Sequence, residues 1–150
     1  AHLGLAGDGP LVPELKALAT QLGIAKQVHF LGFCSDIPRL IHTATATLLV
    51  SDQEGLPRSV MEAMAMGVPV IGTRIRGTED LLKDGAGKLV TVGNSTEITA
   101  EIAWILDNPE ATRTLGLLGR KQVQQYDLSQ ILSLHDGIYT DALKEAQPCK

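Results

Sequence analysis

The sequence predicts an α/β fold: a Rossmann-like parallel sheet with helices on both faces and a helical carboxyl-terminal end. Short apolar runs bounded by turn residues alternate with segments whose apolar residues recur at helical spacing, which is typical of repeated βα units. The apolar runs are nearly continuous, as expected for strands buried on both faces. Only 3% of the residues are aromatic, so the core must be aliphatic. A chain of 150 residues has the size of one domain with one core.

The first half of the chain predicts three strands, each followed by a helix. Apolar residues at helical spacing mark the first helix. Ser35 or Asp36 can cap the second helix, which passes through residues 39–41. Pro57 suits the first turn of the third helix, and Gly67 ends it. The strands are expected at residues 3–6, 28–31 and 46–50, and the two longer helices at residues 14–22 and 57–66.

The second half predicts two further strands and then a run of helices. Pro109 suits the start of a helix because the amide hydrogen that proline lacks is not needed in the first turn. From Ser95 onward, apolar residues recur at helical spacing. Strands are expected at residues 68–72 and 89–90, a short helix at 78–82, and longer helices around 98–106, 109–118 and 128–143.

The predicted sheet directs attention to the loops that follow its strands. An open parallel sheet binds ligands outside the carboxyl ends of its strands, where the loops lead into the helices. Gly7-Asp8-Gly9 resembles the start of a dinucleotide fingerprint, but Val12 occupies the position of the third glycine, which argues against a nicotinamide or flavin site. The candidate loops comprise residues 7–10, 32–35, 51–57 and 73–77.

The stretch from residue 51 to residue 67 carries the strongest functional signal. Gly55 lets the backbone approach a ligand closely, and Pro57 presets the first helical turn. The free amides at this helix start suit phosphate groups or sugar hydroxyls. Glu54 precedes the helix and Glu62 lies in its second turn, so the two carboxylates are expected to address different parts of one bound molecule. Glu62 has mostly apolar neighbours, and a charge in such a setting usually has a partner.

A purely structural interpretation of the same stretch stays open. Glu54 would then be an acidic residue that favours the helix dipole, and Glu62 part of a solvated helix face. The three cations near the expected cleft, Arg58, Arg74 and Arg76, fit a diphosphate site and a surface role equally well.

Composition argues against nucleic-acid binding, a metal site and a membrane span. The net charge of −4 and the pI near 5.5 argue against nucleic-acid binding, which usually needs a basic patch. Cys34 and Cys149 do not make a disulfide framework, and the histidines share no metal-ligand spacing, so no metal site is predicted. No apolar run is long enough to span a bilayer and no leader precedes the first strand, so we expect a cytoplasmic location.

Five blocks of sequence resemble one known family. Residues 54–70, which read Glu-Gly-Leu-Pro-Arg-Ser-Val-Met-Glu-Ala-Met-Ala-Met-Gly-Val-Pro-Val, resemble the E-x7-E region of the retaining glycosyltransferases of family 4. These are GT-B enzymes that transfer sugars from activated nucleotide donors. The blocks occur in the expected order over most of residues 3–90. The other four are Leu5-Ala-Gly-Asp-Gly-Pro, Val28-His-Phe-Leu-Gly-Phe, Gly77-Thr-Glu-Asp-Leu-Leu and Asp84-Gly-Ala-Gly-Lys-Leu-Val.

The resemblance implies a role for each matching residue. Glu54 would act as the catalytic residue that contacts the donor sugar near the reaction centre, and Glu62 would bind the ribose hydroxyls. Arg76 stands where the family commonly has a small residue, in a loop near the donor pocket. The remaining donor-binding residues are Gly55, Leu56, Pro57 and Arg58, around the sugar hydroxyls and phosphate, and Gly32, Phe33 and Cys34, beside the base.

The resemblance also implies the activity. We expect a hexosyltransferase-type enzyme of polysaccharide or glycoconjugate biosynthesis that transfers a sugar from a nucleotide-diphosphate sugar, with a UDP-sugar favoured, to an acceptor with retention. No cofactor or obligatory metal is expected. Two alternatives stay open: a nucleotide-sugar epimerase of the same architecture, and a non-catalytic nucleotide-sugar-binding module.

By the same resemblance, residues 1–150 would be a single donor-binding domain from the carboxyl-terminal part of a longer protein. The family's first βα unit, which holds its basic phosphate-binding pair, and its amino-terminal acceptor domain would precede it. We therefore expect the isolated chain to bind donor weakly and to transfer nothing. Peripheral membrane association of the longer protein is left open.

Overall fold

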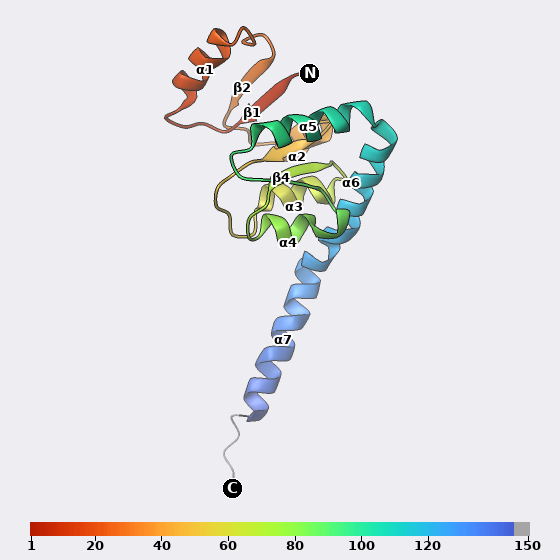
Figure 1. Cartoon of the computed structure of the whole chain (residues 1–150). Helices are drawn as coiled ribbons and strands as arrows, with labels where there is room; N and C mark the ends of the chain where they lie inside the picture. The colour runs from red at the N-terminus through yellow and green to blue at the C-terminus, as the bar shows by residue number, and fades with distance from the viewer. Residues whose placement is uncertain (146–150) are drawn as a thin grey trace. The chain divides into compact units, whose positions relative to one another are not determined.

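The computed structural model describes residues 1–145, so Cys149 lies outside the described residues. Parallel strands alternate with helices and the chain continues into a long terminal helix, which confirms the predicted fold class (Figure 1). The chain divides into two compact units, Ala1–Arg39 and Leu40–Lys150. The five strands accordingly form two sheets, of two and three strands.

The first unit contains one βα unit and a second strand. Strands β1 (Leu3–Ala6) and β2 (Val28–Gly32) pair in parallel, with Leu3 opposite Val28. Helix α1 (Val12–Gln21) connects them and begins two residues before the predicted start. It stops at Gln21 because Gly23, at φ 72°, adopts the left-handed conformation that ends helices.

Helix α2 (Ile37–Thr43) spans the division between the units. Of its two candidate caps, Asp36 is the one that acts, since its Oδ1 accepts a hydrogen bond from the Arg39 amide at 3.1 Å.

The second unit holds the three-stranded parallel sheet. Strands β3 (Thr47–Leu49), β4 (Val70–Thr73) and β5 (Lys88–Val90) lie in that order, and every residue of the central strand β4 is buried. Helices α3 (Arg58–Ala65) and α4 (Thr78–Leu82) cover one face and α5 (Ser95–Asp107) covers the other (Figure 1). Burial of β4 on both faces is the reason its sequence is apolar up to Thr73, whose buried hydroxyl forms a hydrogen bond.

Aliphatic side chains from the sheet and its helices build the core of this unit. Met64 of α3, Ile71 of β4 and Val90 of β5 are fully buried, and Ile105 of α5 is nearly so. Trp104 of α5 is half-buried against the cluster of Ile71, Val90 and Ile105, with the Lys88 ammonium 3.6 Å from its ring centre.

Two long helices complete the chain. After a short 3₁₀ turn, η1 (Lys83–Gly85), and α5, helix α6 (Pro109–Val123) packs against α3. It is five residues longer than predicted, because the apolar spacing weakens after Leu118 while the backbone stays helical. A second 3₁₀ turn, η2 (Gln124–Tyr126), leads into α7 (Leu128–Glu145). None of the described helices combines the length and the apolar character that a membrane crossing requires.

Candidate functional site

The carboxyl ends of β3, β4 and β5 place three loops at one edge of the three-stranded sheet. Residues 50–57 follow β3, residues 74–77 follow β4 and residues 91–94 follow β5. Because the strands are parallel, all three loops lie at the same edge, where the sequence predicted the ligand. Each loop leads directly into the amino end of a helix.

The loop that carries Glu54 rests against the end of β4 and the loop that follows it. The hydroxyl of Thr73 donates a hydrogen bond to the carbonyl oxygen of Ser51 at 2.6 Å. At the other end of the loop, the carbonyl oxygen of Gly55 lies so close to Gly77 that a Cβ on Gly77 would overlap it. The sequence placed residues 73–77 near the donor pocket but did not predict that they touch the Glu54 loop.

The two glutamates of the E-x7-E stretch differ in their surroundings. Glu54 is half-buried in the loop, and Glu62 is half-buried in the second turn of α3. Oε1 of Glu62 lies 3.7 Å from Nη2 of Arg58, one turn earlier on the helix. The partner expected for Glu62 is therefore Arg58, which is itself 87% exposed. An ion pair this exposed is weak, so it leaves the carboxylate available to a ligand.

The three helices that begin at this edge are capped differently. In α5, the Asn94 side chain accepts a hydrogen bond from the Glu97 amide at 3.2 Å. In α4, Asp80 accepts one from the Gly77 amide at 3.4 Å. Helix α3 begins after Pro57, in extended conformation, and no side chain among residues 1–145 caps it. The first amides of α3 are therefore available to an anionic group.

The sequence did not single out Glu97, whose side chain also supports the start of α5. Its carboxylate accepts hydrogen bonds from the Thr91 amide at 2.7 Å, the Thr91 hydroxyl at 3.1 Å and the Asn94 side chain at 2.7 Å. The backbone hydrogen bond from Thr91, the two side-chain hydrogen bonds and the positive charge of Arg74 hold the pKa of Glu97 below its usual value. The Asn-x-x-Glu pattern at residues 94–97 is the signal that could have identified it.

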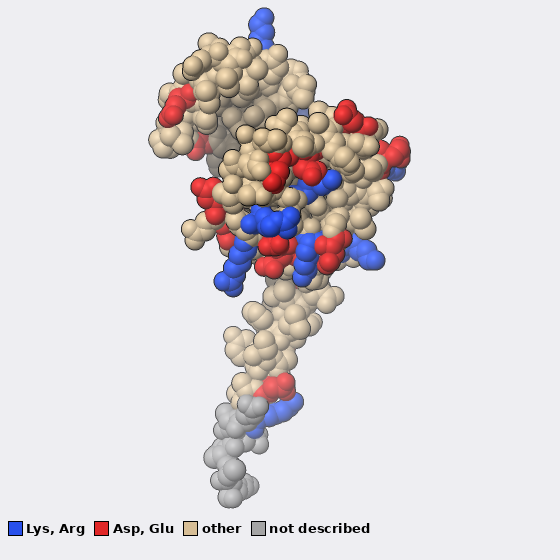
Figure 2. All heavy atoms as spheres, in the orientation of Figure 1, with Lys and Arg blue, Asp and Glu red and all other residues tan. Residues whose placement is uncertain are grey.

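Two of the three arginines near this edge form ion pairs with glutamates. Nη1 of Arg74 lies 3.2 Å from Oε1 of Glu79 in α4, and Arg58 pairs with Glu62. Arg76 is exposed and forms no ion pair with the described side chains of residues 1–144. On the face shown in Figure 2, basic and acidic side chains are interspersed over the body of the protein.

The other predicted site residues belong to the first unit, at the carboxyl end of β2. Gly32, at φ 63°, ends the strand, and its carbonyl oxygen accepts a hydrogen bond from the Gly7 amide at 2.7 Å. Two of the candidate loops, 7–10 and 32–35, are therefore neighbours. Phe33 is 87% exposed, and the half-buried Cys34 thiol lies 3.6 Å from the Gly32 carbonyl oxygen. Contact of these residues with a base stays a prediction.

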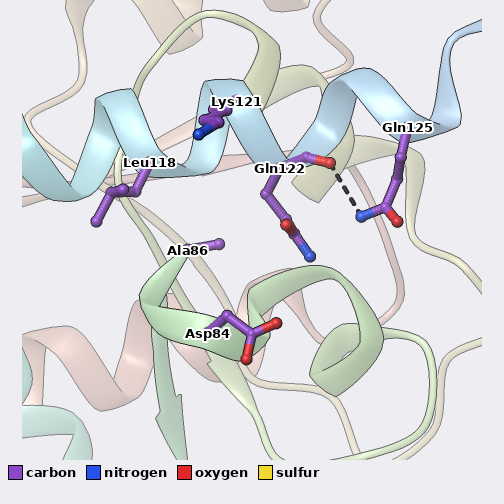
Figure 3. A pocket seen from close by; sticks show the side chains of 6 residues that line it. All are labelled: Asp84, Ala86, Leu118, Lys121, Gln122 and Gln125. Atoms are coloured by element: carbon purple, nitrogen blue, oxygen red, sulfur yellow. Dashed lines mark hydrogen bonds between the residues drawn. The ribbon is translucent and has the colours of Figure 1, made fainter.

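A cavity of about 340 Å³ lies elsewhere in the second unit (Figure 3). Asp84 and Ala86 line it on one side, just before β5, and Leu118, Lys121, Gln122 and Gln125 line it on the other. It is therefore at the amino end of β5, and no predicted site residue lines it. Within residues 1–145, no three His, Cys, Asp or Glu side chains gather as metal ligands would.

Comparison with known proteins identifies relatives of nearly the whole chain. EpsD of Bacillus subtilis is 35% identical over 140 residues, which are 93% of this chain and 37% of that protein. N-acetyl-alpha-D-glucosaminyl L-malate synthase of Bacillus anthracis is 34% identical over 147 residues, 97% of this chain and 39% of that protein. The chain thus spans less than half the length of these relatives.

Solved structures also resemble nearly the whole chain. Anabaena HepE in complex with UDP superposes with a TM-score of 0.89 at 28% identity, covering 94% of this chain and 41% of HepE. The HepE complex with UDP-glucose gives 0.86 at 29% identity, covering 93% and 41%. The profile of the family described as "Glycosyl transferases group 1" matches residues 1–122. Because that match covers well over half of the sequence, the chain belongs to the group 1 glycosyltransferase family.

Proposed function

We propose that this chain holds the donor in an enzyme that transfers a sugar from a nucleotide-diphosphate sugar to an acceptor. One observation carries the proposal: the two E-x7-E carboxylates flank an uncapped helix start at the ligand-binding edge of a parallel sheet. Membership of the group 1 family supports it. So do the complexes of HepE with UDP and with UDP-glucose.

Each residue of the stretch has a distinct proposed role. Glu54 contacts the donor sugar near the bond that breaks, and Glu62 accepts hydrogen bonds from the ribose hydroxyls. The amides of Gly55, Leu56 and Arg58 and the positive end of the α3 dipole stabilise the departing diphosphate. Pro57 has no amide hydrogen to donate, so its role is to fix the backbone at the start of α3.

The finer assignments extend this proposal. The donor is a UDP-sugar carrying a hexose, and transfer proceeds with retention and without an obligatory metal. Gly32, Phe33 and Cys34 border the base. The exposed Phe33 ring offers a flat apolar surface suited to a planar base. The acceptor is bound by sequence that this chain does not contain.

A labelled-donor assay tests the function. The protein, expressed at its full gene-encoded length, is incubated with radiolabelled UDP-glucose, UDP-galactose or UDP-N-acetylglucosamine as the donor. GDP-mannose tests a donor with a different base. Lipid-linked and soluble sugars are supplied as acceptors. We expect label on an acceptor, and NMR of the product shows whether the anomeric configuration is retained. Label in a different UDP-sugar would instead establish an epimerase, and donor binding without turnover would establish a binding module. Glu54→Gln is the control, since it keeps the side-chain shape and removes the charge.

A further inference from the structure

The loop that carries Glu54 has few contacts of its own. Asp52, Gln53, Gly55 and Leu56 are exposed, Ser51 and Glu54 are half-buried, and Pro57 at the end of the loop is buried. A surface loop with so few buried groups is mobile unless other parts of the fold hold it. Two contacts that hold it come from Thr73, the last residue of β4, and from Gly77, the residue before α4.

Thr73 holds the amino-terminal side of the loop. It ends the buried strand β4 and is only 1% exposed, and its hydroxyl donates the 2.6 Å hydrogen bond to the Ser51 carbonyl oxygen. Among residues 1–145, this is the side-chain hydrogen bond that reaches the loop from a distant part of the sequence. Because a β-branched side chain in a packed strand is restricted at χ1, the direction of this donor is well defined.

Gly77 holds the other side of the loop. It is buried, has φ 82°, and packs its Cα directly against the Gly55 carbonyl. A Cβ at this position would overlap the Gly55 oxygen and lie 2.6 Å from its carbonyl carbon. The amide of Gly77 donates a hydrogen bond to the Asp80 carboxylate, which fixes Gly77 at the start of α4.

We infer that Thr73 and Gly77 are positioning residues for Glu54. Their two contacts, at Ser51 and Gly55, lie on either side of Glu54 in the sequence and fix the backbone from which its carboxylate extends. The inference rests on the function proposed above. Because a misplacement of about 1 Å at a reacting group can cost about 100-fold in rate, the two residues control turnover without touching the substrate.

Matched variants separate positioning from general stability. Thr73→Val removes the hydroxyl, and its match is Thr112→Val, at a buried threonine whose hydroxyl donates to the Ile105 carbonyl oxygen at 2.9 Å. Gly77→Ala adds the overlapping Cβ. Its match is Gly85→Ala, at a glycine with a similar φ of 78°, where an added Cβ would meet no heavy atom within 4 Å. Thr73→Ser retains the donor.

We expect a split between turnover and binding in the full-length protein with UDP-sugar donor. Thr73→Val and Gly77→Ala lower kcat by about 10- to 100-fold and leave the donor KM nearly unchanged. Thr73→Ser keeps most of the rate, and Thr112→Val and Gly85→Ala stay close to the parent. The double variant Thr73→Val with Glu54→Gln has the same kcat as Glu54→Gln alone, because both changes remove the same contribution to turnover, that of the correctly placed Glu54 carboxylate.

Two results would overturn the inference. One is a fall in kcat in the matched variants equal to that in Thr73→Val and Gly77→Ala. The other comes from hydrogen–deuterium exchange, which needs no activity: amides of residues 51–56 should exchange faster in Thr73→Val than in Thr112→Val, and equal rates refute the contact's role. If the full-length parent is active and Thr73→Val and Gly77→Ala lower kcat no more than their matched variants do, the inference is rejected and the proposed function stands. A parent that turns over no nucleotide sugar rejects the proposed function, and the exchange data still decide whether the loop is held.

Discussion

At the scale of single residues, Glu54 and Glu62 occupy separate kinds of backbone, which supports the separate roles proposed for them. Glu62 sits on a helix, where its position follows from α3 itself and where Arg58 is its neighbour. Glu54 sits in a loop that contacts Thr73, at the end of β4, and Gly77, just before α4. Substitutions at the two positions should therefore affect different kinetic parameters.

Glu62→Ala is expected to weaken UDP binding by about 10- to 100-fold, since a hydrogen bond to a charged group contributes about 1.5–3 kcal/mol. Titration calorimetry on the full-length protein measures it. Glu54→Ala should leave UDP affinity nearly unchanged while lowering turnover, and Glu110→Ala, at an exposed residue of α6, is a surface control. Unchanged UDP affinity in Glu62→Ala would make the ribose assignment wrong.

At the scale of elements, the start of α5 depends on an ionised Glu97. Hydrogen bonds hold its pKa below the usual value of 4.5, so the folded state favours the charged form. This contribution to stability is present above pH 4.5 and is lost as the pH falls through the lowered pKa.

We therefore expect Glu97→Gln to lower the Tm at pH 7, and we expect the difference from the parent to shrink as the pH is lowered through and below 4.5. Thermal unfolding followed by circular dichroism from pH 7 to pH 3 measures both. Glu14→Gln, at an exposed glutamate in the first turn of α1, is the control. A Tm difference that stays constant with pH would mean that the charge of Glu97 is not what stabilises the helix start.

The packing of α3 against α6 depends on a close approach at Gly116. A Cβ there would overlap the carbonyl oxygen of Gly67, which ends α3. Gly116→Ala should destabilise the protein by about 1–3 kcal/mol through overpacking. Gly137→Ala is the matched change, in α7, where a Cβ meets no atom within 4 Å. It should stabilise by about 0.5–1 kcal/mol, because alanine is the better helix former. Urea unfolding monitored by fluorescence of Trp104 tests the pair, and equal effects would refute the steric explanation.

At the scale of the whole molecule, the two units differ in how much apolar surface they bury. Within residues 1–39, Ala19 is the buried apolar side chain, whereas the second unit buries Val60, Met64, Ile71, Leu81 and other aliphatic residues. A two-stranded sheet with little buried surface is marginal by itself.

Native-state hydrogen exchange should therefore show lower protection in the first unit. Amides of β1 and β2, such as those of Leu5 and Phe30, are expected to exchange through openings of lower free energy than those of Ile71 and Gly72 in β4. Equal free energies in both sheets would mean that the units unfold as one cooperative body.

The sequence by itself determined the order and type of the elements and the E-x7-E stretch. These features are local: apolar spacing, Pro57 and Gly67 act on the backbone within a few residues, and five ordered blocks sufficed to identify the family. Boundaries were off by a few residues, as at α1 and α6, because the last turns are set by neighbours rather than by spacing.

Only the tertiary structure decided how the candidate site is built. Thr73 forms a hydrogen bond with Ser51, 22 positions away in the sequence, and Gly77 packs against the Gly55 carbonyl, which is also distant in the sequence. No local pattern therefore encodes either contact. The division of five predicted strands into two sheets is likewise a matter of which strands pair. The sequence could name Glu54, but the structure identifies the residues that hold it, because loop geometry is set by long-range packing.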